Sequence, residues 1–122
     1  MTDVFRGIAE LAPIELGDGL VARTVQGDRM TFAVVDLQPG AVLPEHQHEN
    51  EQIGLIVQGE MELRVGSETR LLRPGDTYVI PSNVPHTARA GAEGASVVDV
   101  FSPRRADWES RPRKEPTKPD WP

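Results

Sequence analysis

Turn signals recur at short intervals between residues 20 and 101, and this spacing constrains the fold more than any other feature of the sequence. Pairs such as Gly27-Asp28, Pro39-Gly40 and Gly66-Ser67 separate runs of four to eight residues. The runs are rich in β-branched and apolar residues, and none has a convincing helical period. Many short strands separated in this way are typical of a small antiparallel barrel or sandwich. The predicted strands span 20–26, 30–37, 52–57, 60–65, 69–72, 77–80, 86–90 and 95–101, with a turn at Gly59 and a loop at 91–94.

The two ends of the chain differ from this central region. Residues 103–122 contain five prolines, both lysines and both tryptophans, which favours an extended tail with one helical turn at 106–110. We therefore divide the chain into a β-barrel over 1–102 and a Pro-rich basic tail over 103–122. Residues 3–16 are predicted to form short edge strands or an arm that pairs with another subunit. We expect a homodimer, because the edges of a sheet need covering.

Length, charge and cysteine content exclude several classes of protein. A chain of 122 residues forms one domain, and the absence of cysteine excludes disulfides, Cys-based metal sites and a thiol nucleophile. Residues 1–102 carry 15 acids and 7 bases, whereas residues 103–122 carry 4 acids and 6 bases. An acidic body repels phosphate, so nucleic acid is not the expected partner. There is no apolar run long enough to span a membrane and no signal-peptide pattern, so we predict a cytoplasmic protein.

All three histidines of the chain lie in two short patches bounded by turns. His46 and His48 are two residues apart in a segment that reads as a strand, so their side chains are expected on the same face. His86 follows the turn-rich segment 81–85. Imidazole is the commonest metal ligand in proteins, and this clustering predicts that the three side chains share one metal ion.

The spacing around these histidines resembles the cupin family, whose fold is a conical, jelly-roll-like antiparallel β-barrel that holds one metal. The first cupin motif is Gly, five residues, His-x-His, three or four residues, an acid, six residues and Gly. It falls here on Gly40, His46, His48, Gln52 and Gly59. The family places Glu where this chain has Gln52, which is a chemical change at a ligand position.

The second cupin motif is Gly, five residues, Pro-x-Gly, two residues and His. It falls on Gly75, Pro81, Asn83 and His86, so Asn replaces the second glycine. Because Asn tolerates the left-handed backbone conformation better than most residues, we expect the turn to be retained. Together the two motifs cover about half of the chain and include every histidine.

The fourth metal ligand follows from strand alternation. Gln52 is expected on the face that carries His46 and His48, whereas Glu51 points away unless a bulge intervenes. We therefore predict His46, His48, Gln52 and His86 as ligands, with Glu51 as the alternative to Gln52. Imidazole-rich sites accept nickel, zinc, manganese and iron, and the sequence does not choose among these divalent ions.

A closer resemblance is to the small pectin-degradation cupins, carried by the runs 46–53 (HQHENEQI) and 99–108 (DVFSPRRADW). These cupins convert 4,5-unsaturated monouronates into the open-chain ketone form with a metal held by three His and one Gln. The resemblance implies that Asp99, Phe101 and Arg105 face the substrate. The alternatives are that Asp99 caps a loop or forms a buried salt bridge, and that Arg105 is a solvated charge. Arg23, Arg70, Arg73 and Tyr78 lie on predicted strands, and nothing in the sequence singles them out.

Neutral ligands leave a bound ion with its full charge, which favours polarisation of an oxygen and binding of an anion over oxygen activation. We therefore predict a metal-dependent isomerase- or lyase-type enzyme that acts on a small, oxygen-rich, carboxylate-bearing molecule. Asp99 would shuttle a proton, Arg105 would grip a carboxylate and Phe101 would supply an apolar wall. The alternatives are a metal-dependent dioxygenase or polyketide cyclase, and a non-catalytic small-molecule-binding module.

Overall fold

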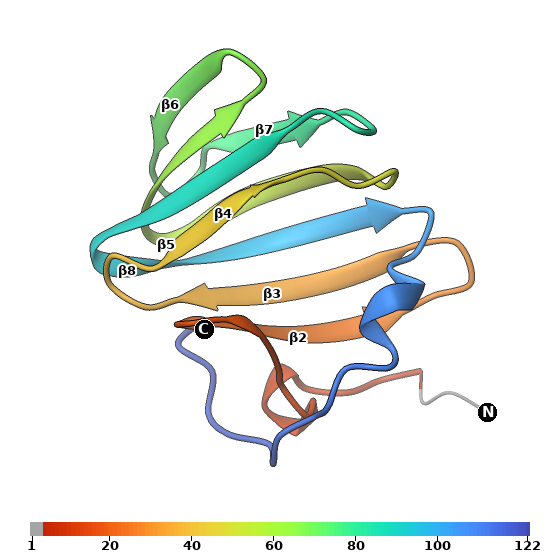
Figure 1. The fold of residues 1–122 in the computed structure, drawn as a ribbon. Coiled ribbons are helices and arrows are strands. Elements are labelled where there is room, and N and C mark those ends of the chain that lie inside the picture. The colour runs from red at the N-terminus through yellow and green to blue at the C-terminus, as the bar shows by residue number, and fades with distance from the viewer. Residues whose placement is uncertain (1–3) are drawn as a thin grey trace.

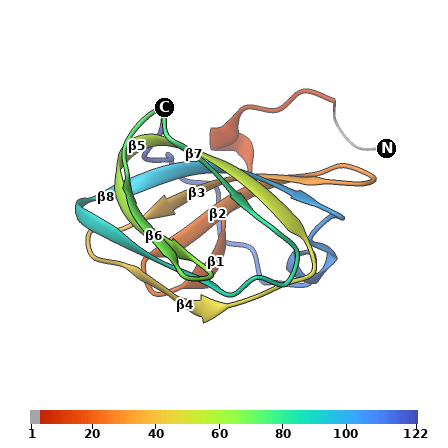
Figure 2. The same ribbon diagram turned by 90° about the horizontal axis from the view of Figure 1, so that it is seen from above.

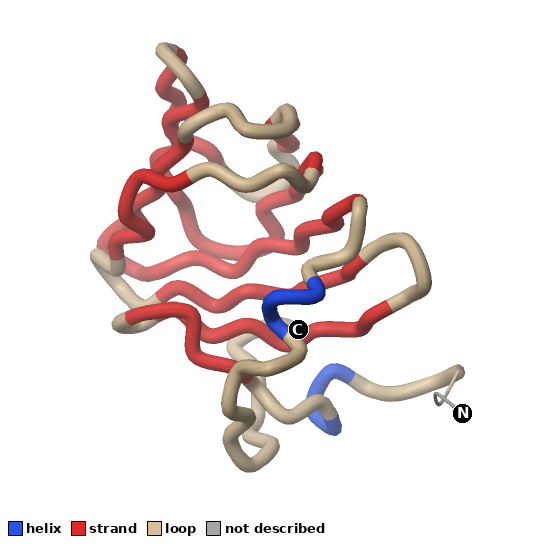
Figure 3. The backbone as a smooth tube through the Cα atoms, turned by 45° about the vertical axis from the view of Figure 1, so that its right-hand side comes forward, coloured by secondary structure: helices blue, strands red, loops and turns tan. Residues whose placement is uncertain are grey.

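The computed structural model describes residues 4–122 as eight antiparallel strands and two single-turn 3-10 helices (Figures 1 and 3). The predicted all-β, jelly-roll-like fold is confirmed. Among the described residues, no helix is long and apolar enough to cross a membrane. The elements are η1 (Ile8–Glu10), β1 (Ile14–Gly17), β2 (Leu20–Gln26), β3 (Thr31–Leu37), β4 (Val42–His46), β5 (Glu51–Val65), β6 (Glu68–Leu72), β7 (Thr77–Ile80), β8 (His86–Ser102) and η2 (Ala106–Trp108).

Two long strands, β5 and β8, connect two layers of the structure (Figure 2). In one layer the N-terminal half of β5 pairs with the C-terminal half of β8, and β5 also pairs with β7 and β8 with β3. In the second layer the C-terminal half of β5 pairs with the N-terminal half of β8, and β5 also pairs with β6 and β8 with β4. The pairing order runs β1-β2-β3-β8-β5-β6 and does not return to β1 within residues 4–122, so hydrogen bonds do not close the sheet into a ring.

The interior between the layers is filled by alternate residues of each strand. On β3, Ala33, Val35 and Leu37 belong to the buried core, whereas Phe32 and Asp36 lie on the opposite face. This alternation is what positions the site described below, because inward-facing polar residues must then share the same interior. The core also contains Ile14, Leu20, Ala22, Ile56, Met61, Leu63, Leu72, Ala88, Ala90, Ala95, Val97, Phe101 and Trp108.

The C-terminal tail packs against the outer face of β2 and β3. Beneath it, Arg23 and Asp36 form an ion pair with an N–O distance of 3.1 Å, and both side chains are at least 94 % buried. Arg23 also donates to the carbonyl and the hydroxyl of Thr117, and the Asp120 amide donates to Asp36. The hydroxyl of Ser96 donates to the second oxygen of Asp36. The tail is therefore held by a buried polar cluster rather than left in solvent.

Three boundaries differ from those predicted. Gly59 is not a turn, because β5 continues through it as a kinked strand with a φ of +70° and a shifted register. Residues 91–94 likewise lie within β8 rather than in a loop. A Cβ atom at Gly59 would lie well within 3.0 Å of the Gly94 carbonyl, so the close approach of the two strands requires glycine here. Strand β4 ends at His46, which leaves His48 in the following loop.

The N-terminal segment supplies one of the predicted edge strands. Ile14–Gly17 pairs with β2 at the end of the pairing order, so it is an edge strand of this chain's own sheet. Val4 and Phe5 are 81 % and 90 % exposed, respectively. Residue 3 of the predicted arm lies outside the described residues.

Candidate metal centre

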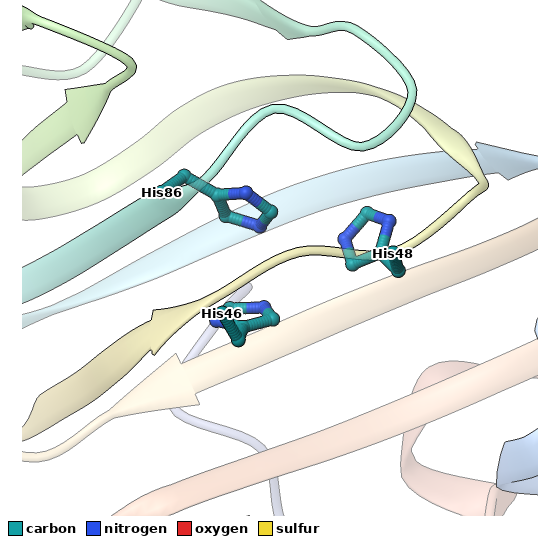
Figure 4. Close-up of side chains that lie close together, drawn as sticks. All are labelled: His46, His48 and His86. Carbon is teal, nitrogen blue, oxygen red and sulfur yellow. The ribbon is translucent and has the colours of Figure 1, made fainter.

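The three histidines converge inside the fold (Figure 4). His46 is the last residue of β4, His48 lies in the loop that follows, and His86 is the first residue of β8. One nitrogen from each ring can be chosen such that all three lie within 4.8 Å of one another. His48 therefore lies beside His46, as predicted, although it is in a loop and not in the predicted strand.

Backbone carbonyls fix the orientation of all three rings. In each histidine, Nδ1 lies 2.9 Å from the carbonyl oxygen of a residue two positions away. A carbonyl oxygen only accepts, so Nδ1 carries the hydrogen and Nε2 presents its lone pair. The Nε2 atoms of His48 and His86 are buried and have no hydrogen-bond partner among the described residues. The carbonyls belong to Pro44 for His46, Asn50 for His48 and Val84 for His86.

This arrangement fits a divalent cation. Metal-ligating histidines donate their second N–H to a backbone carbonyl or carboxylate, which fixes the tautomer and leaves the other nitrogen for the ion. Two buried imidazole nitrogens without a partner would otherwise be an unexplained cost to folding. The donor set favours zinc, nickel, iron or copper over magnesium or calcium, because imidazole is a poor ligand for hard ions.

The turn before β8 brings His86 to the other two histidines. Asn83 has a φ of +59°, so the left-handed conformation that was predicted for this position is confirmed. Its backbone N–H donates to the carbonyl of His48 at 2.8 Å, which ties the turn to the histidine loop. His46 and His86 are also register partners across β4 and β8. Two local contacts thus unite segments that are about 40 residues apart in the chain.

Gln52 and Glu51 point to opposite sides of β5. Gln52 is 8 % exposed and lines the cavity that contains the histidines, whereas Glu51 is exposed on the outer side. Of these two residues, Gln52 alone faces the cavity that contains the histidines. Gln52 therefore stays our prediction for the fourth ligand.

The electrostatic surroundings keep the imidazoles of His48 and His86 uncharged. Burial lowers the pKa of His86 to about 4, and the neighbouring histidines add to this effect. Burial and the nearby Arg105 charge also lower the pKa of His48 below its usual value. Because neutral imidazole is the ligating form, these two rings are ready to bind a cation at neutral pH.

The histidines form one wall of a cavity of about 340 Å³, and Asp99 forms part of another. The hydroxyl of Tyr78 donates to Oδ1 of Asp99 at 2.5 Å. Burial raises the pKa of Asp99 to about 6, and the neighbouring Tyr78 and Gln52 side chains reduce that rise. Burial and the Asp99 charge raise the pKa of Tyr78 well above its usual value, so its hydroxyl stays protonated.

Arg105 lies at the edge of this cavity in an aromatic cradle. Its guanidinium carbon is 4.2 Å from the centre of the Trp108 ring and 5.1 Å from that of Phe101. Its Nε and Nη2 donate to the two carboxylate oxygens of Asp107 at 3.1 and 3.0 Å. The Arg105 side chain is only 12 % exposed, so it is not an ordinary solvated charge. Asp107 occupies one edge of the guanidinium and leaves Nη1 for another acceptor.

The Cupin domain family matches residues 33–101, which is more than half of the chain. The chain belongs to the cupin family. This cupin is 33 % identical over 96 residues to the pectin degradation protein KdgF of Dickeya dadantii (strain 3937), covering 77 % of this chain and 87 % of that protein. The structure of KdgF from Halomonas sp. superimposes with a TM-score of 0.80 at 36 % identity, covering 88 % of this chain and 99 % of that one. An RmlC-like cupin from Shewanella frigidimarina gives a TM-score of 0.82 at 25 % identity, covering 88 % and 96 %.

Sequence reasoning did not single out several residues that this cupin places around the cavity. Tyr78 lies on the inner face of β7, and Trp108 and Arg111 reach the cavity from the tail. Alternation along β7 was the available signal for Tyr78, because Ile80 on the same face is buried. Arg23, by contrast, is on the outer face beneath the tail and does not reach the cavity.

Proposed function

We propose that this cupin is a metal-dependent enzyme that converts a 4,5-unsaturated monouronate into its open-chain ketone. One observation carries the proposal: the histidine triad, Asp99 and Arg105 line a single cavity. That cavity combines a cation site, a buried proton carrier and a guanidinium, which are the groups that an anionic, oxygen-rich substrate requires. The likeness to pectin degradation protein KdgF supports the substrate class.

His46, His48, Gln52 and His86 would hold the divalent ion, which when bound supplies Lewis-acid polarisation of a substrate oxygen. Arg105 would bind the substrate carboxylate through the edge of its guanidinium that Asp107 leaves open. Phe101 is buried and packs on both Trp108 and His48, so it supplies a rigid apolar wall between the two charged ends of the site.

Asp99 would carry the proton that the reaction moves. Ring opening breaks the C1–O5 bond and moves the proton of the C1 hydroxyl to O5, which leaves an aldehyde at C1 and an enol at C5. Protonation at C4 with loss of the enol proton then gives the C5 ketone, so the overall change is an isomerisation. In the metal-free protein burial raises the pKa of Asp99 to about 6, which brings this carboxyl group toward the range in which a residue both accepts and returns a proton.

The test is turnover of a 4,5-unsaturated monouronate, followed as loss of the ultraviolet absorbance of the conjugated C4–C5 double bond. We expect activity that is lost with a chelator and restored by one divalent metal. The variant Asp99→Asn should retain metal and lose activity on the order of 100-fold or more, whereas Asp28→Asn, in an exposed turn, serves as a carboxylate control. Absence of turnover by the metal-loaded wild type would refute the proposal, and oxygen uptake would instead indicate a dioxygenase.

We also propose that the enzyme is a homodimer, built on the outer face of β3, β5, β7 and β8. Phe32, Ile53 and Val79 are 38 %, 51 % and 54 % exposed, and Val100 joins them in one cross-strand row. A second copy of this face, with the exposed Phe5 segment, would cover these apolar side chains. Light scattering should give twice the chain mass for the wild type and one chain mass for Ile53→Lys. We also propose that the protein is cytoplasmic, as predicted from the sequence.

A further inference from the structure

Three neighbouring strands place Gly54, Tyr78 and Asp99 side by side on the inner face. Gly54 of β5 is the register partner of Tyr78 on β7 and also of Asp99 on β8. Tyr78 and Asp99 are therefore two strands apart, on either side of a residue that has no side chain. Their contact across Gly54 is the hydrogen bond of 2.5 Å from the Tyr78 hydroxyl to Oδ1 of Asp99.

The space for this bond exists only because residue 54 is glycine. A Cβ atom at Gly54 would lie well within 3.0 Å of the Tyr78 hydroxyl and of Oδ1 of Asp99. Gly54 has no left-handed backbone conformation that would otherwise explain a glycine in the middle of a strand. The close approach of the two side chains accounts for this glycine.

The bond fixes the carboxyl group of Asp99. A carboxylate on a strand has two rotatable bonds, and a group that exchanges a proton must hold its oxygens close to the reacting atoms. Tyr78 is a donor on a rigid ring, and its side chain is packed in the wall of the cavity. By occupying Oδ1 it leaves Oδ2 for the substrate.

We propose that Tyr78 is a positioning residue that holds Asp99 in its reactive orientation through the space above Gly54. This inference rests on the proposed function and deepens it, because it names a residue outside the predicted set on which proton transfer depends. Tyr78 is assigned no direct contact with the substrate.

The kinetic test compares Tyr78→Phe with wild type in the metal-loaded enzyme. The substitution keeps the ring and removes one oxygen atom, so we expect kcat to fall on the order of 10- to 100-fold. We expect KM to change by less than about twofold, because uniform substrate binding is retained, and the metal content to be unchanged. Thr77→Ser, an exposed position on the same strand outside the proposed dimer row, is the matched control. A wild-type kcat in Tyr78→Phe, or a rise in KM alone, would overturn the inference.

A second measurement needs no substrate and so separates this inference from the proposed function. Urea unfolding is measured for four metal-free proteins: wild type, Tyr78→Phe, Asp99→Leu and the double variant. Loss of the hydrogen bond should lower the urea midpoint by about 0.5 M in the wild-type background, and Tyr78→Phe should have little effect once residue 99 is Leu. Equal shifts in both backgrounds would show that the hydroxyl does not act on Asp99, whether or not the enzyme turns over a uronate.

Discussion

The ion pair beneath the C-terminal tail gives the most direct test of how this chain is held together. Asp36 accepts hydrogen bonds from Arg23, Ser96 and the Asp120 amide at 3.1, 2.8 and 3.1 Å, and its side chain is 6 % exposed. The substitution Asp36→Ala leaves the Arg23 charge buried without an opposite charge beside it. Removing one partner of a buried pair costs about 3–5 kcal/mol, against about 5–15 kcal/mol for the whole stability of a domain.

The assay is urea unfolding together with limited trypsin digestion. We expect Asp36→Ala to lose about 3–5 kcal/mol of unfolding free energy, and to be cut faster after Arg113 and Lys114, because the tail that carries them is released. Glu62→Ala, an exposed carboxylate on β5, is the control. The double variant Arg23→Met, Asp36→Leu should recover most of the loss, since apolar groups replace both charges. If Asp36→Ala unfolds within about 1 kcal/mol of wild type, with no faster cleavage, the buried pair does not hold the tail and this reasoning is wrong.

Three further predictions concern the metal centre and the kinked strands. His86→Gln should bind at least about tenfold less zinc or nickel than wild type, as measured by elemental analysis after dialysis. The pKa of His86 is lowered on folding, so its contribution to the stability of metal-free protein is present above pH 6.5 and is lost as pH falls toward 4. Thermal unfolding should therefore show the difference between wild type and His86→Gln shrinking over that range, and a constant difference would contradict the assignment. Gly59→Ala should cost more than about 2 kcal/mol, because it adds a backbone clash to a strained φ. Gly40→Ala, with the same φ of +70° and open space around it, should cost only about 1 kcal/mol in chemical denaturation.

Local patterns in the sequence are sufficient to predict which residues of a strand face inward. Alternation placed Gln52 inside and Glu51 outside, and the structure has them so. The left-handed turn at Asn83 followed from the conformational tolerance of its side chain. These features depend on residues next to one another in the chain, where the period of a strand is a reliable guide.

Features that depend on residues far apart in the chain could not be predicted from the sequence. A glycine between two apolar runs marks a turn as often as a kink, so the sequence predicts a turn at Gly59. The kink depends on the approach of Gly94 from β8. Asp36 follows an ordinary alternating pattern, and nothing near it in the sequence indicates that Thr117 to Asp120 will cover it. The role of Tyr78 likewise depends on Asp99, which is 21 residues away on another strand.

The contacts that orient the three imidazoles have a consequence for how the protein can change over time. Their acceptors are main-chain oxygens of Pro44, Asn50 and Val84, and no substitution at those positions deletes a main-chain oxygen. Many metal centres depend on a carboxylate behind each histidine, which a single mutation can remove. Here the main-chain acceptors persist as long as the backbone path does, so side chains in the cavity walls can be exchanged while the three imidazoles keep their orientation.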